Sequence, residues 1–107
     1  MTASIVNENP TIIDAQTAFA QINIGDSWRM LRLGARNHAY SEANGYIQFD
    51  VKLTGMRRVV VKLNGKDYYD VEIGRLRKLN YIVLEQLRDI DAESLGRIIE
   101  EMAVRNS

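Results

Sequence analysis

Strict alternation of apolar and polar side chains over residues 46–54 constrains the fold of this chain more than any other feature of its sequence. The apolar members of the stretch are Ile47, Phe49, Val51 and Leu53. Because successive side chains of a strand point to opposite faces of a sheet, the pattern is typical of a strand with one buried and one solvated face. One-sided sheets of this kind are antiparallel. The sequence therefore predicts a strand at Tyr46–Thr54 in an antiparallel sheet.

Four further segments have the length and composition of strands, with turn residues between them. They are residues 28–35, 58–63, 69–73 and 81–87. Residues 36–45 hold small and polar side chains and end in Asn-Gly, so a loop is expected there, and another turn is expected at residues 74–80. Connections this short favour an antiparallel meander, because parallel strands need crossovers of a dozen or more residues.

The connection between the strands at 58–63 and 69–73 sets the register of the sheet. Asn64-Gly65 would suit a two-residue hairpin turn. That turn would place the apolar side chains of the second strand on the solvated face, since a slip of one residue reverses every side chain. A loop of three or five residues instead places them beside the apolar side chains of the first strand. We therefore expect a longer or bulged turn.

Each end of the chain carries a helical pattern. Apolar residues at spacings of three and four predict a helix near residues 10–23, which the Asn-Pro pair at 9–10 would start. A second helix is predicted at residues 92–105, with Asp89 and Asp91 as candidate N-caps.

Together these elements predict an α+β fold, in which a four- to five-stranded antiparallel meander sheet is covered by an N-terminal and a C-terminal helix. Residues 1–9 are polar and without pattern, so a flexible tail is expected before a single domain at residues 10–107. Gly96 lowers the stability of the second helix by about 1 kcal/mol relative to alanine, which makes it a candidate for a close backbone approach.

Composition narrows the classes of function. The chain has no cysteine, which excludes disulfides, thiolate nucleophiles and cysteine-ligated metals. Its 14 basic and 14 acidic side chains leave no net charge, whereas a dedicated nucleic-acid binder usually carries a basic excess. No apolar run approaches about 18 residues and the first residues have no signal-peptide pattern, so we expect a cytoplasmic protein without a membrane partner.

The polar residues of the predicted loop and of the helix entry do not form a recognisable catalytic or metal site. His38 lies near Ser41 and Glu42 in the sequence but without a nucleophile motif, so a solvated loop histidine is expected. Three acids resemble a cation loop in spacing, but Ser94 stands where an EF-hand needs its glycine at the sixth position, and Arg97 and Glu100 follow at the ninth and twelfth positions. Helix capping explains the three acids. These acids are Asp89, Asp91 and Glu93.

Asp70 and Glu72 are the remaining candidates for chemistry. A paired-carboxylate hydrolase site is a possible interpretation of two acids on one strand face. Their parity opposes that of the apolar side chains, so we expect both to project into solvent, opposite Arg58 or Lys62 of the neighbouring strand. No enzyme activity, cofactor or metal is therefore expected.

Charge is distributed unevenly along the chain. Residues 57–78 carry seven basic and three acidic side chains, and residues 79–105 carry three basic and six acidic ones. Three interpretations stay open: a surface that contacts phosphates, self-association in which opposite patches meet, or a solvated surface of mixed sign. The possible interaction surface consists of Arg57, Arg58, Arg75, Arg77 and Lys78.

Several short segments resemble a family of small uncharacterised bacteriophage and prophage proteins. The stretch from Val59 to Ile73 has the alternating strand, short turn and Asp-x-Tyr-x-Val-Glu-Phe-like strand of that family, and Arg75 and Arg77 follow it as spaced arginines. Residues 89–95 are similar to its acidic helix entry, and Leu33-Gly34-Ala35-Arg36-Asn37 is similar to its Gly-Ala-Lys-Asn turn. The resemblance implies a phage or prophage origin and transfers no site.

From residues and resemblance together we expect a small, non-catalytic accessory protein of phage or prophage type. It would act in the cytoplasm of a bacterial host cell through protein–protein interaction or self-association, with a homo-oligomer as one outcome. The alternative is a nucleic-acid-associated phage protein that uses the basic surface between Arg57 and Lys78.

Overall fold

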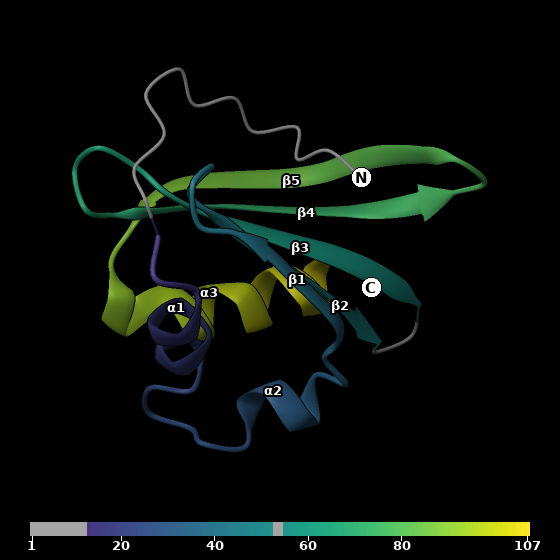
Figure 1. Cartoon of the computed structure of the whole chain (residues 1–107). Coiled ribbons are helices and arrows are strands. Elements are labelled where there is room, and N and C mark those ends of the chain that lie inside the picture. Colours follow the sequence, from purple (N-terminus) through teal and green to yellow (C-terminus); the bar gives the residue numbers. More distant parts are fainter. Residues whose placement is uncertain (1–12, 53–54) are drawn as a thin grey trace.

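The sheet that the sequence predicts has five strands (Figure 1). A computed structural model describes residues 13–52 and 55–107 of the chain. The strands are β1 (Arg36–Ser41), β2 (Tyr46–Lys52), β3 (Met56–Leu63), β4 (Tyr69–Arg77) and β5 (Asn80–Ile90). The helices are α1 (Ala15–Ile22), α2 (Arg29–Arg32) and α3 (Ala92–Arg105). Each strand pairs antiparallel with the next along the chain, which confirms the α+β meander with helices at both ends.

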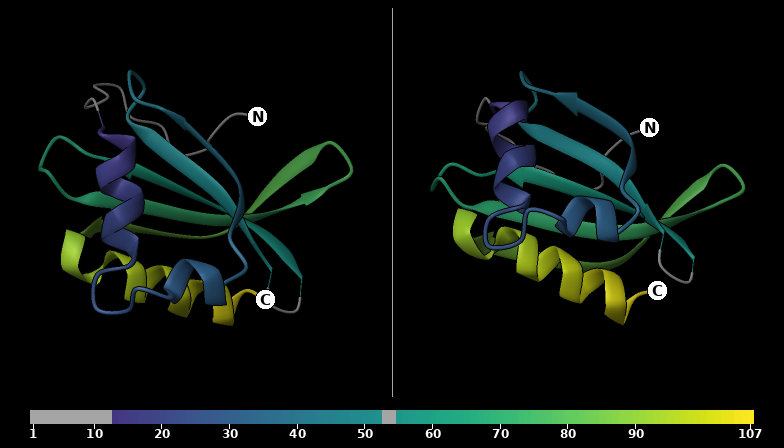
Figure 2. Two further views of the ribbon diagram at one scale, coloured as in Figure 1. Left: turned by 60° about the horizontal axis from the view of Figure 1, so that its bottom comes forward. Right: turned by 90° about the horizontal axis from the view of Figure 1, so that it is seen from below.

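One face of the sheet forms the core together with α1 and α3, which both lie across it (Figure 2). Side chains of neighbouring strands meet there in rows, as where Ile47 pairs with Val61 and Val61 pairs with Val71. All three are fully buried, as are Leu95 and Ile99 of α3. Burying one such side chain stabilises the fold by about 1.5–3 kcal/mol. The alternation of the sequence thus produces the one-sided core.

The turn between β3 and β4 confirms the predicted odd loop. Leu63 pairs with Tyr69, so five residues connect the strands, and the apolar side chains of both strands lie on the same face. Asn64 organises this loop: its side-chain oxygen accepts hydrogen bonds from the backbone N–H groups of Lys66 (2.9 Å) and Tyr68 (3.2 Å). Asn64 thus stabilises the five-residue loop through its side chain, and it is not a central residue of a two-residue turn.

A close approach at Gly96, suggested by its place in a helix, is present where α1 ends against α3. A Cβ atom on Gly96 would overlap the carbonyl oxygen of Ile22 and the guanidinium of Arg29. Arg29 Nη1 donates to the carbonyl oxygens of Ile22 and Ile24, both at 2.9 Å, and Arg29 Nε donates to Glu100 at 3.2 Å. This buried arginine therefore satisfies the end of α1 and ties it to α3.

The C-terminal helix has the predicted bounds, and Asp91 caps it by accepting a hydrogen bond from the backbone N–H of Ser94 at 2.7 Å. Asp89, the other candidate cap, instead lies within β5. At the other end of the chain Asp14 caps α1, through a bond from Thr17. The start of the predicted helix at 10–23 and the expected tail at 1–9 lie outside the described residues.

The predicted strand at 28–35 is wrong, and the predicted loop at 36–45 is correct only for residues 42–45. Residues 29–32 form α2, and β1 follows at residues 36–41. Leu31 and Leu33 seemed to share a strand face, but Leu33 is buried and Leu31 is 72% exposed. Leu31 lies in α2 and Leu33 is its C-cap residue, and two positions this far apart lie on different sides of a helical turn. β1 is an edge strand with exposed polar side chains, so it lacks the alternation by which strands are recognised.

The turn predicted at residues 74–80 is present but much shorter, because β4 continues to Arg77 and β5 begins at Asn80. Only Lys78 and Leu79 form the turn, and Lys78 adopts a left-handed backbone conformation with φ of 59°. Most of the predicted turn therefore belongs to the β4–β5 hairpin, whose end projects from the body of the molecule (Figure 1). β5 also extends to Ile90, beyond the predicted strand end at residue 87.

Candidate interaction surface at the forked end of the sheet

Two hairpins separate at the end of the sheet where β2 ends and β5 begins. β3 pairs with β4 only as far as Arg58 opposite Gly74. The β2–β3 pair continues to Lys52 opposite Met56, and the β4–β5 pair continues to Arg77 opposite Asn80. The hairpins point in different directions beyond this point (Figure 2). We call this end of the sheet, including the start of β1, the fork.

The β4–β5 hairpin is anchored at Gly74. A Cβ atom there would lie 2.6 Å from both the ring of Tyr81 and the carbonyl oxygen of Ile82. The absence of a side chain lets the Tyr81 ring cross β4 and donate a hydrogen bond to Glu72 Oε2 at 2.7 Å. Gln86 Nε2 donates to the other carboxylate oxygen at 2.8 Å, and Glu72 is fully buried. Both acceptor atoms of this buried acid are thus satisfied from β5.

The donor at this anchor keeps its proton over the ordinary pH range. Burial, followed by the bond to Glu72, raises the pKa of the Tyr81 hydroxyl far above its usual value. Tyr81 therefore remains a donor at neutral pH, and the root of the hairpin is held by a ring and two hydrogen bonds.

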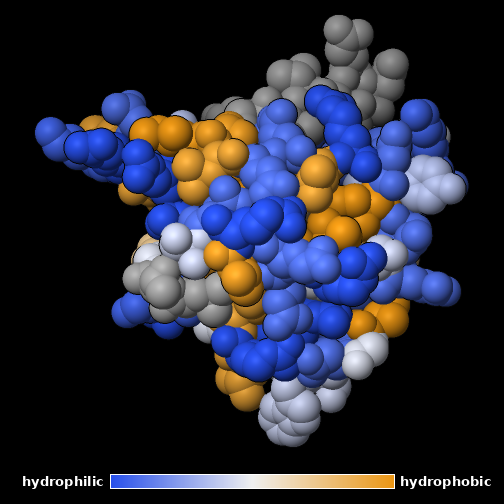
Figure 3. Space-filling view, turned by 180° about the vertical axis from the view of Figure 1, so that it is seen from behind, coloured by the Kyte–Doolittle hydropathy of each residue, from blue (hydrophilic) through white to orange (hydrophobic). Residues whose placement is uncertain are grey.

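Beyond its anchor the hairpin exposes apolar side chains. We call residues 75–84 the arm. Its exposed apolar members are Leu76, Leu79, Ile82, Val83 and Leu84. Leu79, at the tip, is 100% exposed. Figure 3 shows the arm at the left of the molecule, where apolar and strongly hydrophilic side chains lie together. The arm contains Arg75, Arg77 and Lys78 and no acidic residue, so it is both apolar and cationic.

Cations without an acidic partner gather at the fork. Within residues 13–52 and 55–107, seven basic side chains form ion pairs, namely Arg29, Arg32, Arg58, Lys66, Arg88, Arg97 and Arg105. Six form none in this part of the chain, and they are Arg36, Lys52, Arg57, Arg75, Arg77 and Lys78. All six lie where β1 and β3 begin, β2 and β4 end and the arm turns. The fork is therefore the positive end of a molecule with no net charge.

The five residues singled out from the sequence lie on the two hairpins of the fork, Arg57 and Arg58 on β3 and the other three on the arm, and not all are equivalent. Arg58 Nε lies 2.7 Å from Asp50 Oδ1, and Arg58 Nη2 lies 3.1 Å from Asp50 Oδ2, so this arginine is neutralised. Arg57 donates instead to the backbone oxygens of Met56 and Asn106. Sequence reasoning missed Arg36 and Lys52, because they join the surface only through the pairing of β1, β2 and β3.

A pocket of about 220 Å³ lies between the two hairpins of the fork. Its lining residues are Asp50, Met56, Arg57, Arg58 and Leu76. Burial alone would raise the pKa of Asp50, but hydrogen bonds from Arg58 and Asn37 outweigh burial and hold that pKa below its usual value. The ion pair thus forms a fixed polar wall, and Leu76 of the arm forms an apolar one.

Arg75 has an uncompensated donor at the root of the arm. Its Nε atom is buried and has no hydrogen-bond partner in the described part of the chain. A buried donor without an acceptor costs about 1–3 kcal/mol.

The expectation that Asp70 and Glu72 project into solvent is wrong, because both are buried. Glu72 lies opposite Val60, and Asp70 lies opposite Lys62. Asp70 Oδ1 accepts hydrogen bonds from Asn64 Nδ2 and from the backbone N–H of Asp89, both at 3.1 Å. Side chains of β5 and of the β3–β4 loop therefore cover this part of the outer face and engage both carboxylates.

His38 lies in β1 rather than in a loop, and it is exposed as expected. Its ring lies 5.2 Å from the ring of Phe19 and 6.0 Å from that of Phe49, measured between centroids. Ser41 ends the same strand and accepts hydrogen bonds from Asn44, while Glu42 accepts one from the backbone N–H of Ala15. These contacts give the three polar residues structural roles.

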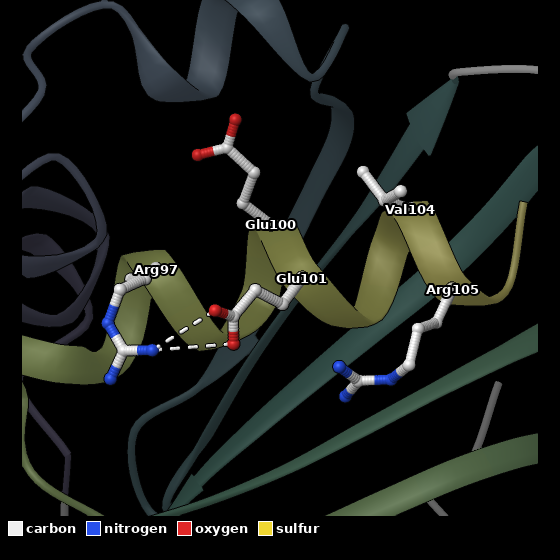
Figure 4. Close-up of a pocket in the computed structure, with 5 residues that line it drawn as sticks. All are labelled: Arg97, Glu100, Glu101, Val104 and Arg105. Carbon is white, nitrogen blue, oxygen red and sulfur yellow. Dashed lines mark hydrogen bonds and ion pairs between the residues drawn. The ribbon is translucent and has the colours of Figure 1, made fainter.

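The hollow along α3 has a volume of about 490 Å³ but no converging chemistry (Figure 4). All its lining residues belong to this one helix. Arg97 and Glu101 face each other at 3.1 Å, and Glu100 points away from them and pairs with Arg29 and Arg32. The charges of the hollow thus neutralise one another within the molecule.

Neither the arrangement of possible metal ligands in the described residues nor the comparison with known proteins points to a particular activity. Among the described residues, no group of three or more His, Cys, Asp or Glu side chains is placed to hold a metal ion. No helix in the described ranges is long and apolar enough to cross a membrane. Comparison with models of known families, with curated proteins and with solved structures found no match for this chain.

Proposed function

We propose that this chain is a non-catalytic binding protein that docks an acidic protein surface through the fork. The proposal keeps the accessory role expected for a phage or prophage protein and assigns that role to one end of the sheet. The observation that carries it is the anchored arm, on which Leu76 and Leu79 are exposed among cations that have no acidic partner in the described part of the chain.

The composition of the arm favours a protein partner over a nucleic acid. Protein interfaces combine an apolar centre with arginine and a polar rim. Nucleic acids are bound mainly through phosphates, which would leave the apolar side chain of Leu79 without a matching surface. Rigidity adds to the case, because the Tyr81–Glu72 bond fixes the root of the arm and so reduces the entropy lost on binding.

Defined probes test this proposal by fluorescence anisotropy. The probes are an acidic peptide that contains leucines, the same peptide with serines in place of the leucines, and a 20-nucleotide duplex. We expect the leucine-containing peptide to bind most tightly, and the Arg75→Glu/Arg77→Glu variant to weaken its binding at least about tenfold. Tighter binding of the duplex would overturn the proposal and favour the nucleic-acid alternative.

A matched control variant separates local charge from total charge. Lys66→Glu/Arg97→Glu makes the same change in net charge at two exposed positions outside the fork. Exposed ion pairs contribute about 0–1 kcal/mol, so this variant should remain folded. Its affinity for the leucine-containing peptide should stay within about twofold of the wild type. An equal loss in both variants would contradict docking through the fork.

A further inference from the structure

The end of the molecule opposite the fork carries exposed carboxylates. They belong to the starts of α1 and α3, the β1–β2 and β3–β4 loops and the end of β5, which lie at the left in Figure 1. They are Asp14, Glu42, Asp67, Asp89, Asp91 and Glu93. We call this set the acidic end. Hydrogen bonds join these segments in pairs. The backbone N–H of Ala15 donates to Glu42, which joins α1 to the β1–β2 loop, and Asn64 donates to Asp89, which joins the β3–β4 loop to β5.

The two ends are complementary in charge. Six cations without an acidic partner in the described residues lie at the fork, and six exposed carboxylates lie at the acidic end, where Lys66 and Arg88 offset part of the charge. The nine residues of β4 separate the ends by roughly 30 Å at about 3.3 Å per residue. This is nearly four Debye lengths at physiological ionic strength, about 8 Å each, so the opposite charges cannot satisfy each other within one molecule.

The acidic end also offers an apolar contact for the arm. Tyr68, in the β3–β4 loop, is 42% exposed beside Asp67. A tyrosine among acids suits Leu79, which is fully exposed among cations. Because the chain carries no net charge, two copies do not repel each other as a whole, and close contact depends on how their ends are oriented.

We infer that the partner of the fork is a second copy of this chain, which presents its acidic end. This inference rests on the proposed function, because it names the occupant of the same surface. The two contacting surfaces differ and lie at opposite ends of the sheet, so the contact is heterologous. Repetition of the contact adds copies head to tail, and the assembly has no reason to stop at a symmetric dimer.

Sedimentation of the full chain at 20 mM and 500 mM salt tests the inference. At low salt we expect the average mass to rise with concentration beyond that of a dimer, and at high salt we expect it to approach one chain. Charge reversal of the fork, Arg75→Glu/Arg77→Glu/Lys78→Glu, should lower the association constant at least about tenfold. Association that is unchanged in this variant would overturn the inference.

Reversal of the acidic end supplies the matching variant, Asp67→Lys/Glu93→Lys. Asp67 has a left-handed backbone with φ of 62°, a conformation that Lys78 already adopts in this chain at 59°. Circular dichroism checks that the variant remains folded. We expect it not to associate alone, but an equimolar mixture with the fork-reversed variant should associate again, because the unchanged fork of one variant can then meet the unchanged acidic end of the other. A mixture that stays monomeric would refute head-to-tail contact.

The two proposals fail differently. A wild type that stays monomeric at low salt but binds the leucine-containing acidic peptide refutes self-association and keeps the fork as a docking surface. A wild type that does neither refutes both proposals. A wild type that binds the 20-nucleotide duplex more tightly than the peptide, and does not self-associate, identifies the fork as a nucleic-acid surface.

Discussion

Two glycines mark two close approaches with opposite outcomes. At Gly96 the end of α1 packs on α3, and the buried Arg29 donates a hydrogen bond to the carbonyl oxygen of Ile22 at this contact. At Gly74 the ring of Tyr81 crosses β4, and beyond it the arm leaves the body with its apolar side chains exposed. The same device closes the core in one region and anchors a projecting surface in the other. The core contact and the projecting surface therefore lie in different regions, and the exposed tip of the arm can be changed without disturbing the core.

Gly96→Ala should have the largest effect on stability. Alanine favours a helix by about 1 kcal/mol over glycine, yet the added methyl group would meet the backbone of Ile22, which cannot move without displacing α1. We expect a net loss of about 3 kcal/mol in the free energy of unfolding, measured by urea denaturation.

Gly65→Ala is the matched control for this substitution. No atom lies within 4 Å of a Cβ placed on Gly65, so the change should stay within about 0.5 kcal/mol. If Gly96→Ala were stabilising, the close contact between α1 and α3 would be wrong.

Gly74→Ala should cost less, about 2 kcal/mol, because part of the overlap is with a side chain that can move. The Tyr81 ring would be displaced and its bond to Glu72 lost. The measurement is urea denaturation combined with hydrogen exchange of the backbone amides of the arm. Exchange should accelerate most in residues 75–84, and in α3 only by the amount that the lower global stability causes. Uniform acceleration would show that the two regions are not separable.

Tyr81→Phe keeps the ring over Gly74 and removes only the donor to Glu72. We expect a loss of about 1.5 kcal/mol at neutral pH, since a buried carboxylate oxygen would lack its partner.

The same variant should also change the dependence of stability on pH. Burial and the bond to Glu72 raise the pKa of Tyr81 in the folded protein, so the unfolded chain releases this proton first. Its contribution is therefore complete below about pH 10 and decreases as the pH rises further. Burial also raises the pKa of Tyr69, so the variant should flatten the alkaline decrease without abolishing it. An identical alkaline slope in both proteins would contradict the buried Tyr81 hydroxyl.

Leu79→Ser should have the smallest effect on stability, within about 0.5 kcal/mol, because the side chain is fully exposed. Its affinity for the leucine-containing peptide should nevertheless fall severalfold. Val104→Ser, at an exposed position of α3, should change neither quantity. Equal affinities of the wild type and the Leu79→Ser variant would contradict an apolar contact between the arm and its partner.

The sequence predicted those parts of the fold in which packing on one face governs residue choice. Alternation in β2 and β3 identified the core rows, and the parity of Val71 required a loop of three or five residues, of which the structure has five. Amphipathic periodicity gave α3 with its correct bounds. In each case the buried face restricts residue type, so the pattern survives in the sequence alone.

The errors fall where no buried face restricts the sequence. β1 has exposed polar residues, and the arm has apolar residues that face solvent, so neither shows alternation. The basic surface was predicted from the clustering of its arginines along the chain, but Arg36 and Lys52 join it only through strand pairing. The burial of Glu72 could not be predicted either, because it depends on Tyr81 crossing Gly74.

The meander order also affects how the chain acquires its fold. Every strand pairs with its neighbour in sequence, so each hairpin can form from local segments. The contact of α1 with α3 is different, since Arg29 and Glu100 are 71 residues apart. During synthesis the first helix must therefore wait until the last helix has emerged. Until that moment the finished hairpins present an uncovered apolar face, and this interval is when the chain is most exposed to aggregation.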